Sequence, residues 1–87
     1  MSSTSKVMIK VLSGRADRNI SFSALCALLS ALGFEKRTKG DHHIYTRYDV
    51  EEIVNIQPRG GDAKPYQVRQ VRNLIVKYKL GLGGNDE

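Results

Sequence analysis

Residues 39–48 read KGDHHIYTRY, and they place the two histidines of this chain side by side, directly after a Gly-Asp pair. Histidine, with an ordinary pKa of about 6.5, can exchange protons near neutral pH. If such an imidazole lies beside RNA, it can take the proton of a 2′-hydroxyl or protonate the leaving 5′-oxygen. Cationic side chains can hold the phosphate and stabilise developing negative charge. Four such residues flank the pair in sequence: Lys36, Arg37, Lys39 and Arg47.

The two histidines cannot serve the same surface if residues 42–47 form a regular strand, because neighbouring side chains point to opposite faces. Alternation groups His42 with Ile44, and His43 with Tyr45 and Arg47. This grouping favours burying His42 and exposing His43, but His42 follows the turn directly and need not have regular strand geometry. Alternation alone leaves the choice open. The competing interpretation is that the two histidines are ordinary residues of a strand with no catalytic role.

Other uses of this segment are less consistent with the sequence. Adjacent histidines diverge on a strand, and Cys26 is the only other Cys or His in the sequence, too few to complete a shell, so the sequence predicts no metal site. Asp41 could orient an imidazole, although accepting a backbone N–H in the turn is the commoner role. Cys26 lies among leucines, which indicates a small core residue rather than a nucleophile.

The chain has 87 residues, which is enough for one domain, 1–87, with a modest core. Lys and Arg outnumber Asp and Glu by 14 to 9, giving a net charge of +5 that suits a polyanionic partner. No segment is long and apolar enough to span a membrane, and the N-terminus lacks a secretory signal. We therefore expect a cytoplasmic protein that needs no cofactor, with flexible ends at 1–5 and 81–87.

The elements that must position the histidines follow from local patterns. A helix is expected from an N-cap at Ser21 to a stop at Gly33, because apolar residues recur there at helical spacing. Short connections then predict an antiparallel meander of three strands. A second amphipathic helix follows a glycine-bearing loop, and residues 6–12 form either a helix or a strand. The expected strands are 34–39, 42–47 and 51–57, and the expected second helix is 65–79.

These elements predict an α+β fold, α-β-β-β-α, in which both helices pack on one face of the sheet. The other face is then open to solvent, and we expect the functional site there. The loop RGGDAK, which ends at Lys64 before the second helix, resembles a phosphate-binding loop at a helix N-terminus. It lacks the Gly-Lys-Ser/Thr ending of a nucleotide-binding loop, so its first interpretation is a simple connection. Arg69 and Arg72 form a basic stripe on that helix, which either contacts phosphates or is simply its solvated side.

Two stretches carry a resemblance to a known family. LGFEKRTKGDHHIYTR and EEIVNIQPRGGDAKPYQVRQVRNLIVKY, within residues 21–80, resemble the HicA toxin family. The shared features are a helix ending in Leu-Gly-Phe, a Lys-Gly-x-His hairpin, and a helix that begins with Lys-Pro after a glycine-bearing loop. Their order and spacing are more specific than any one of them alone.

The resemblance implies a double-stranded-RNA-binding-like fold and a metal-independent mRNA interferase of a type II toxin–antitoxin module. It also implies a HicB-like antitoxin that masks the active site in a hetero-oligomer. The catalytic histidine of the family stands two residues after a glycine, which here selects His42, after Gly40 and Asp41. Family members often carry Ser in place of Asp41. A carboxylate there should weaken RNA binding and favour a protonated imidazole.

The leading hypothesis is thus an endoribonuclease with His42 as general acid or base and with Gly40, Asp41 and His43 as auxiliary residues. The expected RNA-binding residues are Lys36, Arg37, Lys39, Arg47, Lys64, Arg69 and Arg72. Two alternatives use the same basic surface without catalysis. One is an RNA-binding module that recognises A-form RNA by shape. The other is a protein-interaction domain with an acidic partner.

Overall fold

A computed structural model describes residues 3–58 and 60–82 of the chain. Three helices and one three-stranded sheet make up this part of the molecule. In chain order they are α1 (Ser3–Ser13), α2 (Phe22–Ala31), β1 (Glu35–Lys39), β2 (His42–Arg47), β3 (Val50–Ile56) and α3 (Pro65–Tyr78). The expected α+β order is confirmed, and the undecided N-terminal segment is a helix.

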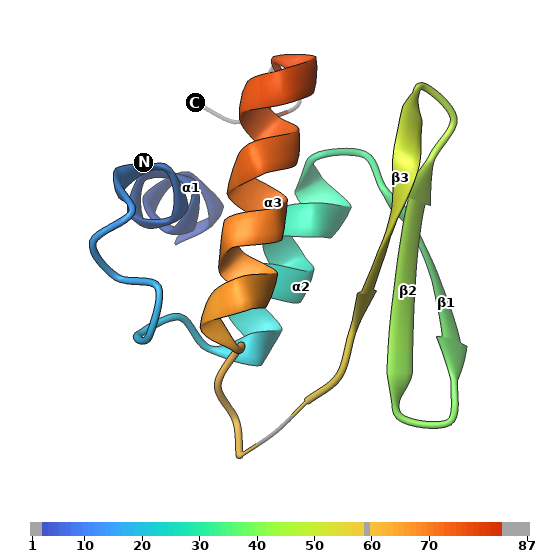
Figure 1. The fold of residues 1–87 in the computed structure, drawn as a ribbon, viewed down its shortest axis with the longest axis horizontal. Coiled ribbons are helices and arrows are strands. Elements are labelled where there is room, and N and C mark those ends of the chain that lie inside the picture. The colour runs from blue at the N-terminus through green and yellow to red at the C-terminus, as the bar shows by residue number, and fades with distance from the viewer. Residues whose placement is uncertain (1–2, 59, 83–87) are drawn as a thin grey trace.

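The sheet is an antiparallel meander in the order β1-β2-β3, as the short connections predict. β2 is therefore the central strand and has hydrogen-bonded neighbours on both sides (Figure 1). The register between β2 and β3 shifts between Tyr45 and Arg47. Such an irregularity bends a strand and changes the direction of its side chains.

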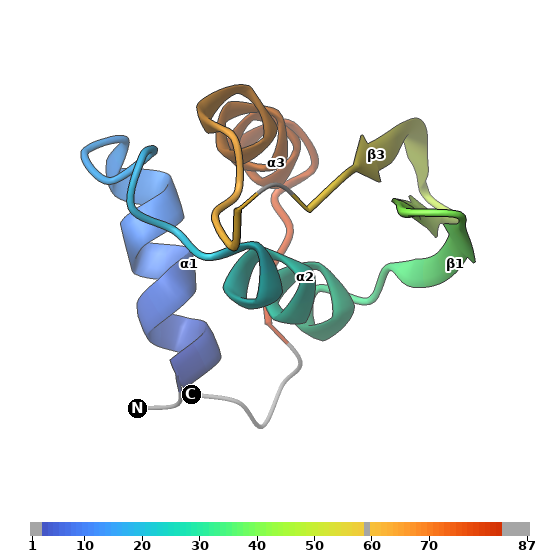
Figure 2. The same cartoon turned by 90° about the horizontal axis from the view of Figure 1, so that it is seen from below.

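The helices form two layers beside one face of the sheet (Figures 1 and 2). α2 and α3 lie next to the strands, and α1 packs against α2 and α3 on the side away from the sheet. The core lies between the sheet and the α2–α3 pair, and it continues to α1 through the fully buried Val11. Among residues 3–58 and 60–82, no helix lies on the opposite face of the sheet, as expected (Figure 2).

The ends of α2 are set by local side-chain chemistry. The Ser21 hydroxyl accepts a hydrogen bond from the Ala24 amide at 3.1 Å, which satisfies one of the free N–H groups of the first turn. Gly33, with φ of 92°, ends the helix in a conformation that glycine adopts without strain. Leu25, Leu28 and Leu29 are fully buried, so the predicted apolar face is the one that meets the core.

α3 begins at Pro65, and the Gln67 side-chain oxygen accepts a hydrogen bond from the Lys64 amide at 3.0 Å. Its apolar residues at helical spacing, Val68, Val71, Leu74 and Ile75, are buried. The Arg72 guanidinium makes two hydrogen bonds to the Asp17 carboxylate, at 2.8 and 3.2 Å, and a third to the Val11 carbonyl at 3.2 Å. This cluster fixes α1 and the loop after it against α3.

The expected flexible ends, 1–5 and 81–87, lie partly outside the described residues. Ser3 already belongs to α1, and Leu82 packs against the core. Among the helices that the structure describes, none has the length and apolar character needed to cross a membrane.

Candidate active site on the open face of the sheet

The two histidines take opposite sides of β2. Tyr45 is 1% exposed and faces the helices, and His43, two residues away, lies half-buried on that same side. His42 is exposed, and alternation along the strand places it with Ile44 on the open face. The arrangement favoured by alternation, with His42 buried and His43 on the open face, is therefore wrong. The open face carries His42, the histidine that the family resemblance selects.

His43 serves the core side of the sheet. Its ring meets the Phe22 ring edge-on, with centroids 5.1 Å apart and an interplanar angle of 83°. The Nδ1 atom of His43 is buried and has no hydrogen-bond partner among the described residues. A ring in this position packs against α2 and has no access to a ligand on the open face.

Two cations share the open face with His42. Lys39 is the cross-strand partner of His42, and Arg37 is the partner of Ile44, so both project to the same side of the sheet. All residues of β1 are exposed, which leaves these charges in contact with solvent. The open face thus combines one imidazole with an ammonium and a guanidinium group, and Glu35, the partner of Thr46, adds a carboxylate on the same side of the sheet.

Asn55 is a member of this site that the sequence analysis did not identify. Its backbone partner is Ile44, so it lies diagonally across from His42 on the same face. The His42 Nδ1 atom and the Asn55 side-chain oxygen are 3.0 Å apart. One signal was available in the sequence: Asn55 is a polar residue between the apolar Val54 and Ile56 of the third expected strand.

The turn before His42 is shaped by glycine. Gly40 has φ of 62°, and Asp41 has no positive φ, which is the pattern of a two-residue turn with glycine at its first central position. A side chain would have room at this position, since an added Cβ would meet no atom within 4 Å. It is the positive φ angle that favours glycine here. Asp41 is exposed, and the hydrogen bond of the His42 ring goes to Asn55 instead.

The other predicted RNA-binding residues are not gathered around His42. Lys36 pairs with Tyr45 across β1 and β2, so it projects to the helix side of the sheet. Arg47 donates to the Leu32 carbonyl at 3.0 Å and pairs with Asp49 at 2.9 Å, which secures the end of α2.

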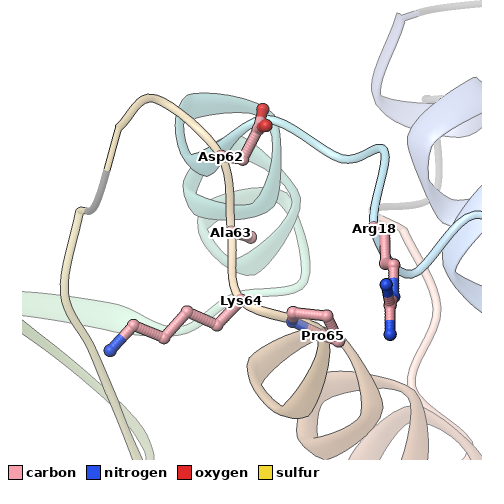
Figure 3. Close-up of a pocket in the computed structure, with 5 residues that line it drawn as sticks. All are labelled: Arg18, Asp62, Ala63, Lys64 and Pro65. Carbon is pink, nitrogen blue, oxygen red and sulfur yellow. The ribbon is translucent and has the colours of Figure 1, made fainter.

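The remaining three lie in or before α3, on the helix side of the sheet. Arg69 is exposed, whereas the Arg72 guanidinium is occupied by Asp17. Lys64 lines a hollow of about 400 Å³ at the start of α3, together with Arg18, Asp62, Ala63 and Pro65 (Figure 3). Its side chain extends away from Arg18, so the two cations do not converge on one point (Figure 3).

A buried tyrosine underlies the site. Burial, together with contact with Cys26, raises the pKa of the Tyr45 hydroxyl above its ordinary value. Cys26 is only partly buried and packs against the core, in agreement with a structural role. Tyr45 therefore stays neutral at physiological pH and packs in the core on the helix side of β2.

The described residues contain no group of three or more His, Cys, Asp or Glu side chains that could hold a metal ion. What they offer on the open face is an exposed imidazole held by an amide and flanked by two cations. Such a set can transfer a proton and bind an anion in the same place.

Comparison with known proteins identifies the class. Residues 22–77, more than half of the chain, match the model of a family described as the HicA toxin of bacterial toxin–antitoxin. Searches of curated proteins and of solved structures gave no significant match. The chain belongs to the HicA toxin family. It is therefore the toxin of a toxin–antitoxin pair, in a family that is generally of nuclease type.

Proposed function

We propose that this protein is an endoribonuclease that cleaves mRNA with His42 as its general acid or base. The observation that supports this proposal most directly is the position of His42 on the uncovered face of the sheet. There it lies on the same face as Arg37 and Lys39 and hydrogen-bonds to Asn55. A toxin that acts on RNA needs a surface which an extended polyanion can reach, and this is such a surface.

The proposed reaction uses the RNA's own 2′-hydroxyl as nucleophile. The hydroxyl loses its proton and attacks the neighbouring phosphorus, and the bond to the 5′-oxygen breaks as that oxygen gains a proton. The His42 imidazole supplies one of these two transfers, a contribution of roughly 10²–10⁴-fold. Arg37 and Lys39 hold the phosphate and stabilise the charge that develops on its oxygens.

The residues that bind RNA in this proposal fall into two groups. Arg37 and Lys39 are placed beside the reacting group, whereas Lys36, Lys64 and Arg69 extend the basic surface around the edge of the sheet and onto α3. Arg47 and Arg72 already have carboxylate partners, so we assign both to the fold. We further propose that a HicB-like antitoxin covers the open face, and that the toxin acts in the cytoplasm without a metal.

The test is induction of the protein in a bacterial host, together with cleavage of purified mRNA. His42→Ala should abolish growth arrest and cleavage while the circular dichroism spectrum stays that of the folded protein. His43→Phe is the matched control, because it changes the neighbouring histidine on the other side of the strand. Cleavage at the wild-type rate by His42→Ala would refute the proposal. RNA binding without products in the wild type would favour a binding module instead.

A further inference from the structure

We infer that Asn55 is a positioning residue, which fixes the His42 ring with its proton on Nδ1 so that Nε2 faces the substrate. This inference rests on the proposed function, since it assigns a role within the same site. The observation behind it is the 3.0 Å separation between His42 Nδ1 and the Asn55 side-chain oxygen.

The direction of this hydrogen bond decides the form of the imidazole. An amide oxygen has no proton to donate, so the His42 Nδ1 atom must carry the hydrogen. In the neutral ring, Nε2 then has the free lone pair and is the atom that can act as a base. In the protonated ring, Nε2–H becomes the donor, and the Asn55 oxygen still accepts from Nδ1–H.

His42 needs such an anchor because little else holds its ring. It is the first residue of β2, directly after the Gly40–Asp41 turn, and its side chain is exposed. The bond to Asn55 is the hydrogen bond that its ring makes within the described part of the chain. Without it, the ring could rotate about its side-chain bonds, and a misplaced catalytic group loses much of its rate advantage.

Asn55 is itself placed on a rigid support. Its neighbours on β3, Val54 and Ile56, are 0% and 1% exposed and belong to the core. The backbone between two buried side chains cannot shift without disturbing the core packing. The backbone of Asn55 is therefore held in place by the core, and its side chain can restrain the exposed His42 ring through their hydrogen bond.

An amide suits this position better than a carboxylate. Both present an oxygen to Nδ1–H, but aspartate would add a negative charge where a phosphate must approach. That difference separates the two effects of the residue. Asn55→Ala removes the acceptor, whereas Asn55→Asp keeps the acceptor and adds repulsion.

The tautomer of His42 can be measured directly, by long-range proton–nitrogen NMR of ¹⁵N-labelled protein at a pH of about 8.5, above the ordinary titration range of histidine. The chain has only two histidines, so His42→Gln assigns the signals. The wild type should show His42 with its proton on Nδ1. Asn55→Asp should preserve that form, and Asn55→Ala should shift it towards Nε2–H. Asn73→Ala, the same change at an exposed site on α3, is the control and should have no effect.

The kinetic readout separates positioning from general damage. Asn55→Ala should lower kcat for RNA cleavage by about tenfold or more with little change in KM, as expected when a group that orients another is removed. Asn55→Asp should keep kcat near the wild-type value and raise KM by about fivefold at low salt, because of one added charge near the phosphate. Thermal stability should stay close to that of the wild type in both variants, because the bond joins two exposed side chains.

The inference is overturned if His42 carries its proton on Nε2 in the wild type, or if Asn55→Ala leaves the tautomer unchanged. It is also overturned if the tautomer shifts and kcat does not. If the wild type cleaves no RNA but shows the Nδ1–H form that depends on Asn55, the nuclease assignment fails while the pairing of the two residues stands.

Discussion

Replacement of His43 by alanine should destabilise the protein, although His43 lies next to the proposed catalytic residue. The edge-on contact between the His43 and Phe22 rings contributes about 0.5–1.5 kcal/mol beyond the burial of area. Loss of the half-buried ring removes apolar contact equivalent to roughly one methylene group, or about 0.8 kcal/mol. Removal of the unpaired Nδ1 atom offsets part of this loss.

If removal of the unpaired Nδ1 atom recovers about 1 kcal/mol, the net loss is about 1 kcal/mol, which corresponds to a fall in Tm of about 4–8 °C for a domain of this size. Urea denaturation gives the free energy of unfolding, and circular dichroism gives Tm. His43→Phe tests the same reasoning in the opposite direction, because it keeps the ring contact and removes the unpaired nitrogen. Its stability should equal or exceed that of the wild type.

His42→Ala is the comparison on the exposed face, where a substitution should change stability by no more than about 0.5 kcal/mol. The pair of histidines should therefore separate stability from activity. The reasoning is refuted if His43→Ala unfolds at the wild-type temperature, or if His43→Phe is clearly less stable. Loss of cleavage in a well-folded His43→Phe variant would move the catalytic role to His43.

Three further predictions concern the whole domain. Hydrogen bonds from Lys77 and Tyr78, at 2.7 and 2.6 Å, lower the pKa of Glu52 to about 2 from its ordinary 4.5. The folded-state pKa of Glu52 is depressed, so the contribution of this carboxylate to the free energy of unfolding is fully present above about pH 4.5 and is lost as pH falls towards 2. Glu52→Gln should therefore flatten the curve of stability against pH over that interval. An unchanged slope would contradict the assignment. Arg72→Ala should cost about 2 kcal/mol in urea denaturation, because it leaves Asp17 without its partly buried partner; a loss below 0.5 kcal/mol, at about the level of an exposed site, would show that this ion pair does not hold α1 in place. Cleavage of RNA should persist in excess EDTA but fall steeply with added salt, since cations hold the phosphates; abolition by EDTA with recovery on adding a divalent ion would disprove the metal-independent reaction.

Local sequence patterns determined most of the elements. Ser21 and Gly33 bound the first predicted helix, and Pro65 starts the second, because caps and backbone preferences act within a few residues. Short connections required an antiparallel meander, and two amphipathic helices on one side implied an open face on the other. The cations of β1 could likewise be assigned from the sequence, because they belong to the strand itself and their position does not depend on a distant segment.

Only the tertiary structure decided which side of β2 is buried. Ile44 and Tyr45 are both apolar enough to face a core, so alternation could not choose between them; the packing of Tyr45 against the helices did. The same contacts put His43 against Phe22 and left His42 beside Asn55, thirteen residues away in sequence. Arg72 was visible as a helix cation, but its partner Asp17 lies 55 residues earlier. Side-chain periodicity reports the environment along one element, whereas pairing between distant segments depends on how the layers meet.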